Sequence, residues 1–267
     1  MVSGIIIATV SVAALGLFIG VFLGVAGEKF KVEVDPNEEK ILSVLPGNNC
    51  GGCGYAGCSG LAAAIAKGEA PVNGCPVGGE DVGKLVGEIM GVAASEGVKM
   101  TAFVKCQGDC DKAKSDYKYT GVSSCSQLAF VPNGGPKSCN YGCLGCGDCV
   151  NVCPFDAISI VNGIAVVNED KCKSCGKCVQ TCPKNIIELV PATSKVRVFC
   201  NSKDKGPVAM KACDSACIGC GLCAKNCKFE AIEVNDFLAH IDYDKCKNCG
   251  LCATKCPKGS IINLRKK

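Results

Sequence analysis

Cysteine is the residue of this chain whose spacing predicts chemistry most directly. Two successive runs follow the pattern Cys-x2-Cys-x2-Cys-x3-Cys, and proline follows the last cysteine of each. Three thiolates on one tight loop can bind three corners of a [4Fe–4S] cluster, while the fourth cysteine of each run reaches across to the other cluster. The predicted ligands are Cys143, Cys146, Cys149 and Cys182 for one cluster, and Cys172, Cys175, Cys178 and Cys153 for the second.

The same pair of runs occurs again towards the end of the chain. The first cysteines of the two runs are 29 residues apart in both pairs, and Phe-Asp-Ala-Ile at 155–158 matches Phe-Glu-Ala-Ile at 229–232. This internal duplication predicts two copies of the two-cluster unit found in bacterial ferredoxins. The further ligands are Cys217, Cys220, Cys223, Cys227, Cys246, Cys249, Cys252 and Cys256.

A different cysteine pattern precedes the duplication. Cys50, Cys53, Cys58 and Cys75 form the pattern C-x2-C-x4-C-x16-C in a stretch rich in glycine. Four thiolates are the number that one more [4Fe–4S] cluster needs. Glycines allow the backbone to wrap closely around a cluster and to point N–H groups at its sulfurs. The sequence therefore predicts five clusters.

Six cysteines lie outside these patterns. Cys139 and Cys213 each stand four residues before a ferredoxin-like run, and Cys106 and Cys200 each follow a short apolar stretch expected to form a strand. Cys110 and Cys125 occur in an insertion found only in the first repeat. One interpretation is a sixth cluster bound by Cys106, Cys110, Cys125 and Cys139; the other is buried free thiols, which pack as small hydrophobic groups. No role is predicted for Cys200 or Cys213.

Structural zinc and a disulfide framework are the alternatives to iron and sulfur. Zinc sites usually pair two CxxC knuckles or include histidine, but His240 is the one histidine of this chain and is expected in a strand. Disulfide scaffolds are typical of short secreted proteins, whereas this chain has 267 residues. Every predicted cluster has four cysteines, so we expect electron transfer and no catalytic residues.

Composition agrees with a protein organised around clusters. Aromatic residues make up 5% of the chain and tryptophan is absent, so a large apolar core is not expected. The formal net charge is +4, but five clusters of about −2 each would bring the loaded protein to about −6. We therefore do not expect binding to nucleic acid.

The N-terminal segment is apolar. Residues 2–27 contain no charged side chain. An uncharged segment of this length is long enough for one membrane-spanning helix. A cleaved signal peptide, the alternative, would have a basic start and a shorter apolar region. Lys29, Lys31 and Lys40 follow the segment, so the positive-inside rule places the C-terminal body in the cytoplasm. We expect a single-pass protein of the cell (inner) membrane.

The predicted fold class is α+β. We expect a transmembrane helix at 1–27, a linker at 28–44, a small helical four-cysteine [4Fe–4S] module at 45–98, a cysteine-containing connector at 99–138, and tandem ferredoxin-like modules at 139–190 and 191–267. Helices are expected at 61–67 and around 82–89 from apolar spacing. A hairpin is expected at 157–167 across the Asn162-Gly163 turn, with closing strands at 186–190 and 261–264.

The order of these parts resembles the B subunit of Rnf complexes, in the longer, duplicated form. The apolar span followed by GNNCGGCGYAGC is the specific part of the resemblance, which covers the whole chain. It implies a subunit of a membrane-bound ferredoxin:NAD oxidoreductase that couples electron flow to Na+ or H+ translocation. It also implies that soluble ferredoxin and the membrane and flavin-bearing subunits of the complex are partners, and that the twenty motif cysteines ligate five [4Fe–4S] clusters, with six if the extra cysteines contribute. The alternatives are a polyferredoxin subunit of another membrane oxidoreductase, such as a hydrogenase, and a zinc-stabilised structural protein.

Overall fold

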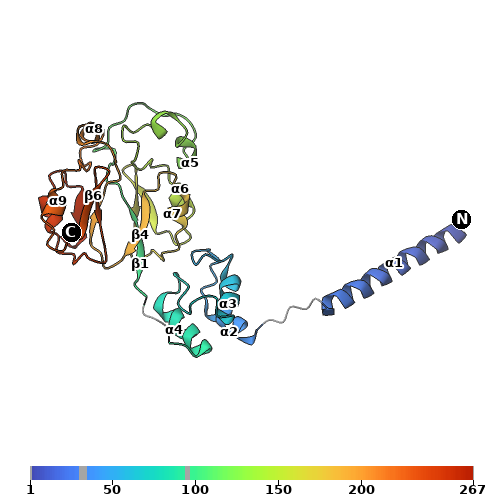
Figure 1. The fold of residues 1–267 in the computed structure, drawn as a ribbon. Coiled ribbons are helices and arrows are strands. Elements are labelled where there is room, and N and C mark those ends of the chain that lie inside the picture. The colour runs from blue at the N-terminus through green and yellow to red at the C-terminus, as the bar shows by residue number, and fades with distance from the viewer. Residues whose placement is uncertain (1, 30–34, 94–96, 267) are drawn as a thin grey trace.

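The computed structural model describes residues 2–29, 35–93 and 97–266 and begins with one long helix (Figure 1). Helix α1 (Val2–Lys29) is exposed along nearly all of its described length, and Figure 1 shows it apart from the rest of the chain. By length and composition, Thr9–Lys29 could cross a membrane, and none of its most apolar window is buried. The expected apolar N-terminal helix is therefore present.

A small helical unit follows, and its core lies between three helices. These are α2 (Pro36–Val44), α3 (Cys58–Ala66) and α4 (Gly79–Met90). Asp35 caps α2 by accepting a 2.8 Å hydrogen bond from the backbone N–H of Asn37. Ile41 of α2 is fully buried with Leu61 and Val86 of the other two helices. The expected linker at 28–44 is thus wrong for α2, which belongs to the module; residues 30–34 lie outside the described residues.

The rest of the chain forms two repeats with the same strand pairing. The first contains β1 (Met100–Val104), β2 (Ile158–Val161), β3 (Ile164–Val167) and β4 (Ile187–Pro191). The second contains β5 (Val196–Val198), β6 (Ile232–Asn235), β7 (Leu238–Ile241) and β8 (Ile261–Asn263). In each repeat the outer strands pair antiparallel and the inner strands form a hairpin.

Strand register is also the same in both repeats. Val104 pairs with Ile187 in the first repeat and Val198 pairs with Ile261 in the second. Asn162 and Gly163, at φ 46° and 78°, form the turn of the predicted first hairpin, as a two-residue turn requires. Because β1 pairs with β4, the expected connector at 99–138 is wrong at its start, and the first ferredoxin-like module begins at β1.

Short helices connect the strands. The cysteine loops lead into α6 (Asp148–Asn151), α7 (Lys177–Thr181), α9 (Leu222–Lys225) and α10 (Leu251–Lys255). Helix α8 (Gly206–Ala212) precedes the second set of loops. The insertion of the first repeat contains α5 (Cys125–Leu128) and the 3-10 turn η1 (Pro132–Gly134), and η2 (Leu264–Lys266) ends the described chain.

Cysteines are part of both repeat cores. In the first repeat Cys143, Cys149, Cys172 and Cys178 are buried with small and aliphatic side chains such as Ile186. The second repeat buries Cys223 and Cys252 in the same way. Large aromatic side chains are scarce in these cores, so the cysteine sites themselves occupy the centre of each repeat.

The repeats contact each other through a buried arginine. Arg197 of β5 is 2% exposed, and its Nη1 lies 2.7 Å from Glu169 Oε1 of the first repeat. Lys195 Nζ approaches the other oxygen of Glu169 to 2.5 Å. The rings of Phe103 and Phe199 meet edge to face, with centroids 4.8 Å apart. Figure 1 shows the two repeats side by side.

Candidate iron–sulfur sites

The four cysteine loops of the repeats share one backbone shape. In each loop the residue before the second cysteine has a positive φ: Gly145 (77°), Ser174 (57°), Gly219 (66°) and Asn248 (55°). The residue after the second cysteine is a left-handed glycine in every loop: Gly147, Gly176, Gly221 and Gly250. These reversals fold three cysteines of each run into one compact loop, as ligands of a cubane must be.

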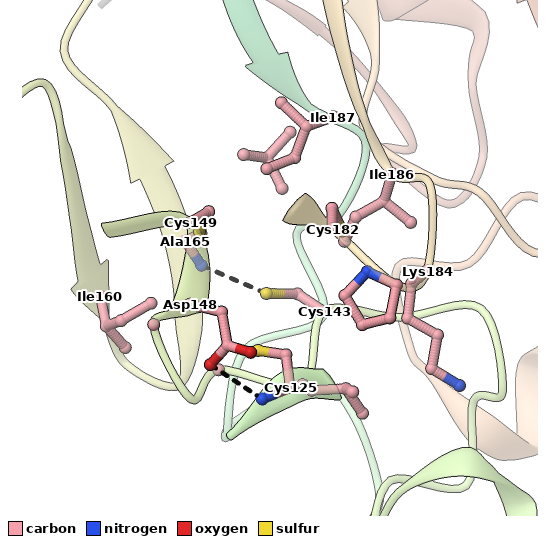
Figure 2. A pocket seen from close by; sticks show the side chains of 15 residues that line it. Cys125, Cys143, Asp148, Cys149, Ile160, Ala165, Cys182, Lys184, Ile186 and Ile187 are labelled. Atoms are coloured by element: carbon pink, nitrogen blue, oxygen red, sulfur yellow. Dashed lines mark hydrogen bonds between the residues drawn. The ribbon is translucent and has the colours of Figure 1, made fainter. Parts of the chain in front are cut away.

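The first cavity collects cysteines from two runs. Figure 2 shows Cys143 and Cys149 of the first run and Cys182 of the second run around this cavity. The backbone N–H of Ala165 donates to Cys143 Sγ at 3.4 Å, which is the kind of hydrogen bond that stabilises cluster sulfur. The fourth cysteine of the second run therefore faces the first run, as the crossed pattern predicts.

Two further cavities are each lined by all three loop cysteines of one run and the fourth cysteine of its partner run, whereas the first cavity has Cys125 among its lining residues and not Cys146. One is lined by Cys172, Cys175 and Cys178 together with Cys153, and the backbone N–H of Ala102 in β1 donates to Cys172 Sγ at 3.3 Å. The other is lined by Cys217, Cys220, Cys223 and Cys256. The three cavities enclose about 380, 320 and 350 Å³ of empty space. The remaining set places Cys246, Cys249 and Cys252 on one loop, and Cys227 and Cys252 belong to the same core.

Burial keeps the innermost thiols protonated in the absence of metal. Desolvation raises the pKa of Cys149 and of Cys178 to about 12, and the pKa of Cys223 and of Cys252 to about 11. Each is the third cysteine of its run. Metal binding must displace these protons, so the four sites are suited to a strongly thiophilic group.

The four-cysteine module holds Cys53, Cys58 and Cys75 in one unit. Asn49 Oδ1 accepts a 2.8 Å hydrogen bond from the backbone N–H of Cys58, and the backbone N–H of Gly78 donates to Cys75 Sγ at 3.4 Å. These contacts fix the loop that carries the ligands.

The module lies directly against the first repeat. A Cβ added to Gly52 would stand 2.6 Å from the carbonyl oxygen of Cys175. Cys50 is close enough to Cys175 to raise the pKa of its thiol, after the larger effect of burial. The predicted ligands of the module thus approach those of one ferredoxin-like site.

The structure divides the set suggested for an extra cluster. Cys106 and Cys139 line one cavity, but their neighbours there are Cys200 and Cys213. Cys125 lies on the first cavity, with its backbone N–H 3.0 Å from Asp148 Oδ1 (Figure 2). Cys110 is exposed and lies against Gly163. The grouping with Cys110 and Cys125 is therefore wrong; the equal positions of Cys106 and Cys200, and of Cys139 and Cys213, were the signal in the sequence.

Comparisons with known proteins agree with these sites. Residues 45–77 match the family model described as "Putative Fe-S cluster", and residues 142–186 and 216–260 match the model described as "4Fe-4S dicluster domain". The matched segments contain the twenty motif cysteines. Cys106, Cys139, Cys200 and Cys213 fall outside them.

Whole-chain relatives are more specific, and three of them are B subunits of named complexes. The chain is 44% identical over 261 residues to that of the "Ion-translocating oxidoreductase complex" of Methanosarcina acetivorans, covering 97% of this chain and 98% of that protein. It is 46% identical over 262 residues to that of the "Na(+)-translocating ferredoxin:NAD(+) oxidoreductase complex" of Acetobacterium woodii, covering 98% and 78%. It is 42% identical over 261 residues to that of the "Proton-translocating ferredoxin:NAD(+) oxidoreductase complex" of Clostridium ljungdahlii, covering 96% and 92%.

Proposed function

Since this chain belongs to the B subunits of ion-translocating ferredoxin:NAD(+) oxidoreductase (Rnf) complexes, we propose that it is the membrane-anchored electron relay of such a complex. It accepts electrons from reduced soluble ferredoxin and delivers them to membrane and flavin-bearing subunits. The complex couples ferredoxin oxidation and NAD reduction to Na+ or H+ translocation. The single described span carries no ionisable residue before Glu28, so the transported ion is bound by other subunits.

The twenty motif cysteines are the proposed ligands. [4Fe–4S] clusters supply one-electron chemistry there, with potentials that depend on hydrogen bonds to sulfur and on solvent exposure. The cavities lined by crossed cysteine sets support this assignment, because two of them offer four motif thiols from two runs and the first offers three. No residue in the described part of these sites is assigned a bond-making role.

The contact between the four-cysteine module and Cys175 carries the proposal. Gly52 leaves no space for a side chain against the Cys175 carbonyl, so the module's ligand loop and one ferredoxin-like loop approach as closely as backbones can. The module follows α1 directly in the chain. We therefore place the outlet of the relay at the module, beside the membrane, and the inlet at the opposite end of the repeats.

The inlet is assigned to the loop of Cys249. Cys249 occupies the position in the second repeat that Cys175 occupies in the first, yet Cys249 is exposed while Cys175 is buried. Exposed lysines on this loop and its neighbours outnumber the exposed Asp242 and Asp244, and Lys245 is paired with Asp242 at 3.4 Å; the lysines are Lys225, Lys228, Lys245, Lys247 and Lys255. A basic surface beside an exposed ligand suits an acidic electron donor, because complementary charge speeds encounter.

Charge reversal tests the inlet. In Lys247→Glu/Lys255→Glu protein, reduction by ferredoxin should slow by about tenfold at low salt and depend less on ionic strength. The matched control is Lys67→Glu/Lys118→Glu, which makes the same charge change at exposed lysines elsewhere. The measurement is stopped-flow bleaching of the visible absorbance of anaerobic protein. Equal rates in the two variants would contradict the inlet, and failure of ferredoxin to reduce the unaltered protein would contradict the relay.

Metal analysis tests the ligands. Anaerobically prepared protein should contain iron and sulfide in equal amounts, with about 20 irons in the five motif sites. Zinc without sulfide would instead support a zinc-stabilised structural protein.

A further inference from the structure

We propose that Cys106, Cys139, Cys200 and Cys213 bind an additional [4Fe–4S] cluster at the junction of the two repeats. The four cysteines line one cavity, hereafter the junction site. The role of this site as a link in the relay rests on the proposed function, whereas its occupancy can be measured by metal content alone.

The junction site takes two equivalent cysteines from each repeat. Cys106 and Cys200 come two residues after the ends of β1 and β5, which are the equivalent first strands of the two repeats. Cys139 and Cys213 each stand four residues before the first motif cysteine of their repeat. Because each repeat contributes two equivalent cysteines to the same cavity, four thiols surround one point, which is the number that a four-iron cluster needs.

The size of the junction cavity also suits a [4Fe–4S] cluster. The junction cavity contains about 360 Å³ of space, part of it open to solvent, within the range of 320 to 380 Å³ measured in the same way for the three cavities lined by motif cysteines. Gly108 forms part of its wall, and a Cβ there would stand 3.3 Å from Cys213 Sγ and 3.7 Å from Cys106 Sγ. The backbone thus approaches the sulfurs closely, as it does around the motif sites.

Hydrogen bonds already point at the junction sulfurs. The backbone N–H of Cys143 donates to Cys106 Sγ at 3.4 Å, and the equivalent N–H of Cys217 donates to Cys200 Sγ at 3.3 Å. Ser215 Oγ lies 3.4 Å from Cys213 Sγ. Donors to sulfur stabilise ligating thiolates and their cluster. Cys106 and Cys200 therefore each accept a backbone hydrogen bond at sulfur, at equivalent positions in the two repeats.

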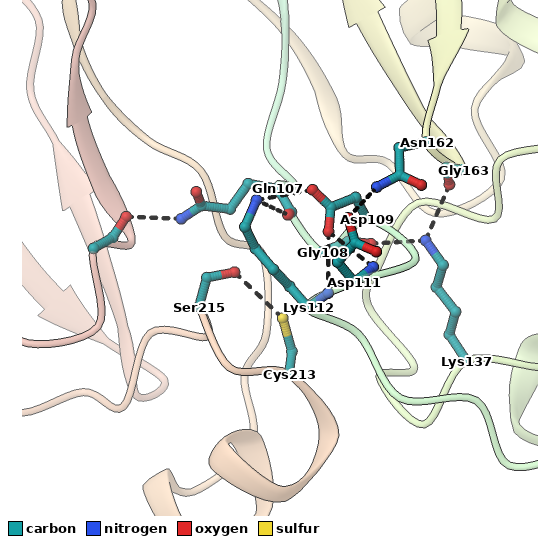
Figure 3. Close-up of polar contacts among 11 residues, drawn as sticks. Gln107, Gly108, Asp109, Asp111, Lys112, Lys137, Asn162, Gly163, Cys213 and Ser215 are labelled. Carbon is teal, nitrogen blue, oxygen red and sulfur yellow. Dashed lines mark hydrogen bonds and ion pairs between the residues drawn. The ribbon is translucent and has the colours of Figure 1, made fainter.

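The loop that follows Cys106 is held by both repeats (Figure 3). Gln107 Nε2 donates to the carbonyl of Gly259 in the second repeat at 2.7 Å. Lys137 Nζ donates to the carbonyls of Gly108, at 2.8 Å, and of Gly163, at 3.1 Å. Ala113 forms an isolated β-bridge with Cys213. The insertion of the first repeat therefore clamps the junction site, and Lys137 is one of the residues that line it.

Cluster binding balances chemically. Four thiols form four Fe–S bonds to a [4Fe–4S]2+ core and release four protons, which leaves about −2 on the site. The hydrogen bonds from Cys143 and Cys217 connect this site to the first motif ligand of each repeat. The ligand sets then follow one another from the module, through the Cys175 loop and the Cys143 loop, to the junction site and the second repeat.

Counting iron tests the proposal. The full-length protein should contain about 24 irons, and Cys106→Ala/Cys200→Ala should contain about 20. The matched control is Cys110→Ala, which removes an exposed cysteine that lines neither the junction site nor a motif-cysteine cavity and should leave the iron content unchanged. Native mass spectrometry of the unaltered protein should give six clusters. This count decides the outcome even if the paired variant loses its fold and more than one cluster.

Three outcomes would overturn the proposal: five clusters in the unaltered protein, one zinc ion that the paired variant loses, or equal iron loss in the control. A protein with five clusters that ferredoxin still reduces would remove the junction site and leave the proposed relay standing. EPR of the fully reduced protein gives a further readout, because magnetic coupling between the two repeats should weaken in the paired variant.

Discussion

The guanidinium carbon of Arg197 lies 5.2 Å from the ring centroid of Phe103, and the two residues hold the same position in β5 and β1. Each stands one place before the valine that pairs with an isoleucine of the closing strand. The repeats therefore meet through equivalent positions, so the contact between them lies close to their axis of pseudosymmetry. Both the junction site and this contact depend on the same alignment of β1 with β5.

Replacing Arg197 should loosen the two repeats. In Arg197→Ala protein, Glu169 loses its partner at 2.7 Å and Phe103 loses the overlying cation. Breaking a buried ion pair costs about 3 kcal/mol, so visible absorbance should be lost at a lower guanidinium chloride concentration. Arg265→Ala is the matched control, because Arg265 is exposed. Equal midpoints for both variants would show that the buried pair does not contribute.

Crossed ligation predicts in which double substitutions the losses of iron add up. Cys182→Ala combined with Cys143→Ala removes two ligands of one cluster, so the iron loss should stay at about four. Cys182→Ala combined with Cys172→Ala affects two clusters, and the loss should approach eight. Iron and sulfide assays of the anaerobic proteins measure both values. The reverse result would mean that each run binds its own cluster.

The module should separate from the first repeat when Gly52 acquires a side chain. Gly52→Ala places a methyl group 2.6 Å from the Cys175 carbonyl oxygen, which no real contact tolerates. Iron content should be unchanged, but spin coupling between the module and the first repeat should fall in EPR spectra of the reduced protein. Gly60→Ala is the control, because its Cβ would meet only Tyr55 Cβ, at 3.7 Å. Retained coupling in Gly52→Ala would contradict the observed contact.

Helix α1 should be dispensable for the clusters and required for the membrane. Deleting residues 2–29 removes a helix that is exposed along nearly all of its described length, so the iron content per chain should not change. The truncated protein should no longer float with lipid vesicles, whereas the full-length protein should. Vesicle flotation with iron quantification measures both properties. Loss of iron on deletion would show that α1 also supports the fold.

The fold of the repeats was predictable because ligand spacing constrains the chain locally. The hairpin at Asn162-Gly163 and the closing strands follow from short patterns, and the crossed facing of Cys182 follows from the ferredoxin rule. Helix α2 was missed because its sequence is mostly polar, and only tertiary packing of Ile41 reveals its role.

The grouping of the extra cysteines could not be read from spacing alone. Cys106 and Cys139 are 33 residues apart, whereas Cys200 and Cys213 are 13 apart. The insertion hides the correspondence between the pairs, and the site forms only when the two repeats pack together. Sequence patterns report ligands of one loop well, but a site shared between repeats depends on long-range contacts.

The distance between α1 and α2 limits where the protein can deliver its electrons. Helix α1 ends at Lys29 and the cap of α2 is Asp35, and six residues of fully stretched chain reach roughly 20 Å. With α1 in a bilayer, the start of α2 must stay within that distance of the end of α1, which keeps the four-cysteine module on the membrane side of the protein. Any acceptor must therefore come to the membrane surface to be served, which restricts it to a neighbour embedded in, or pressed against, the same lipid leaflet.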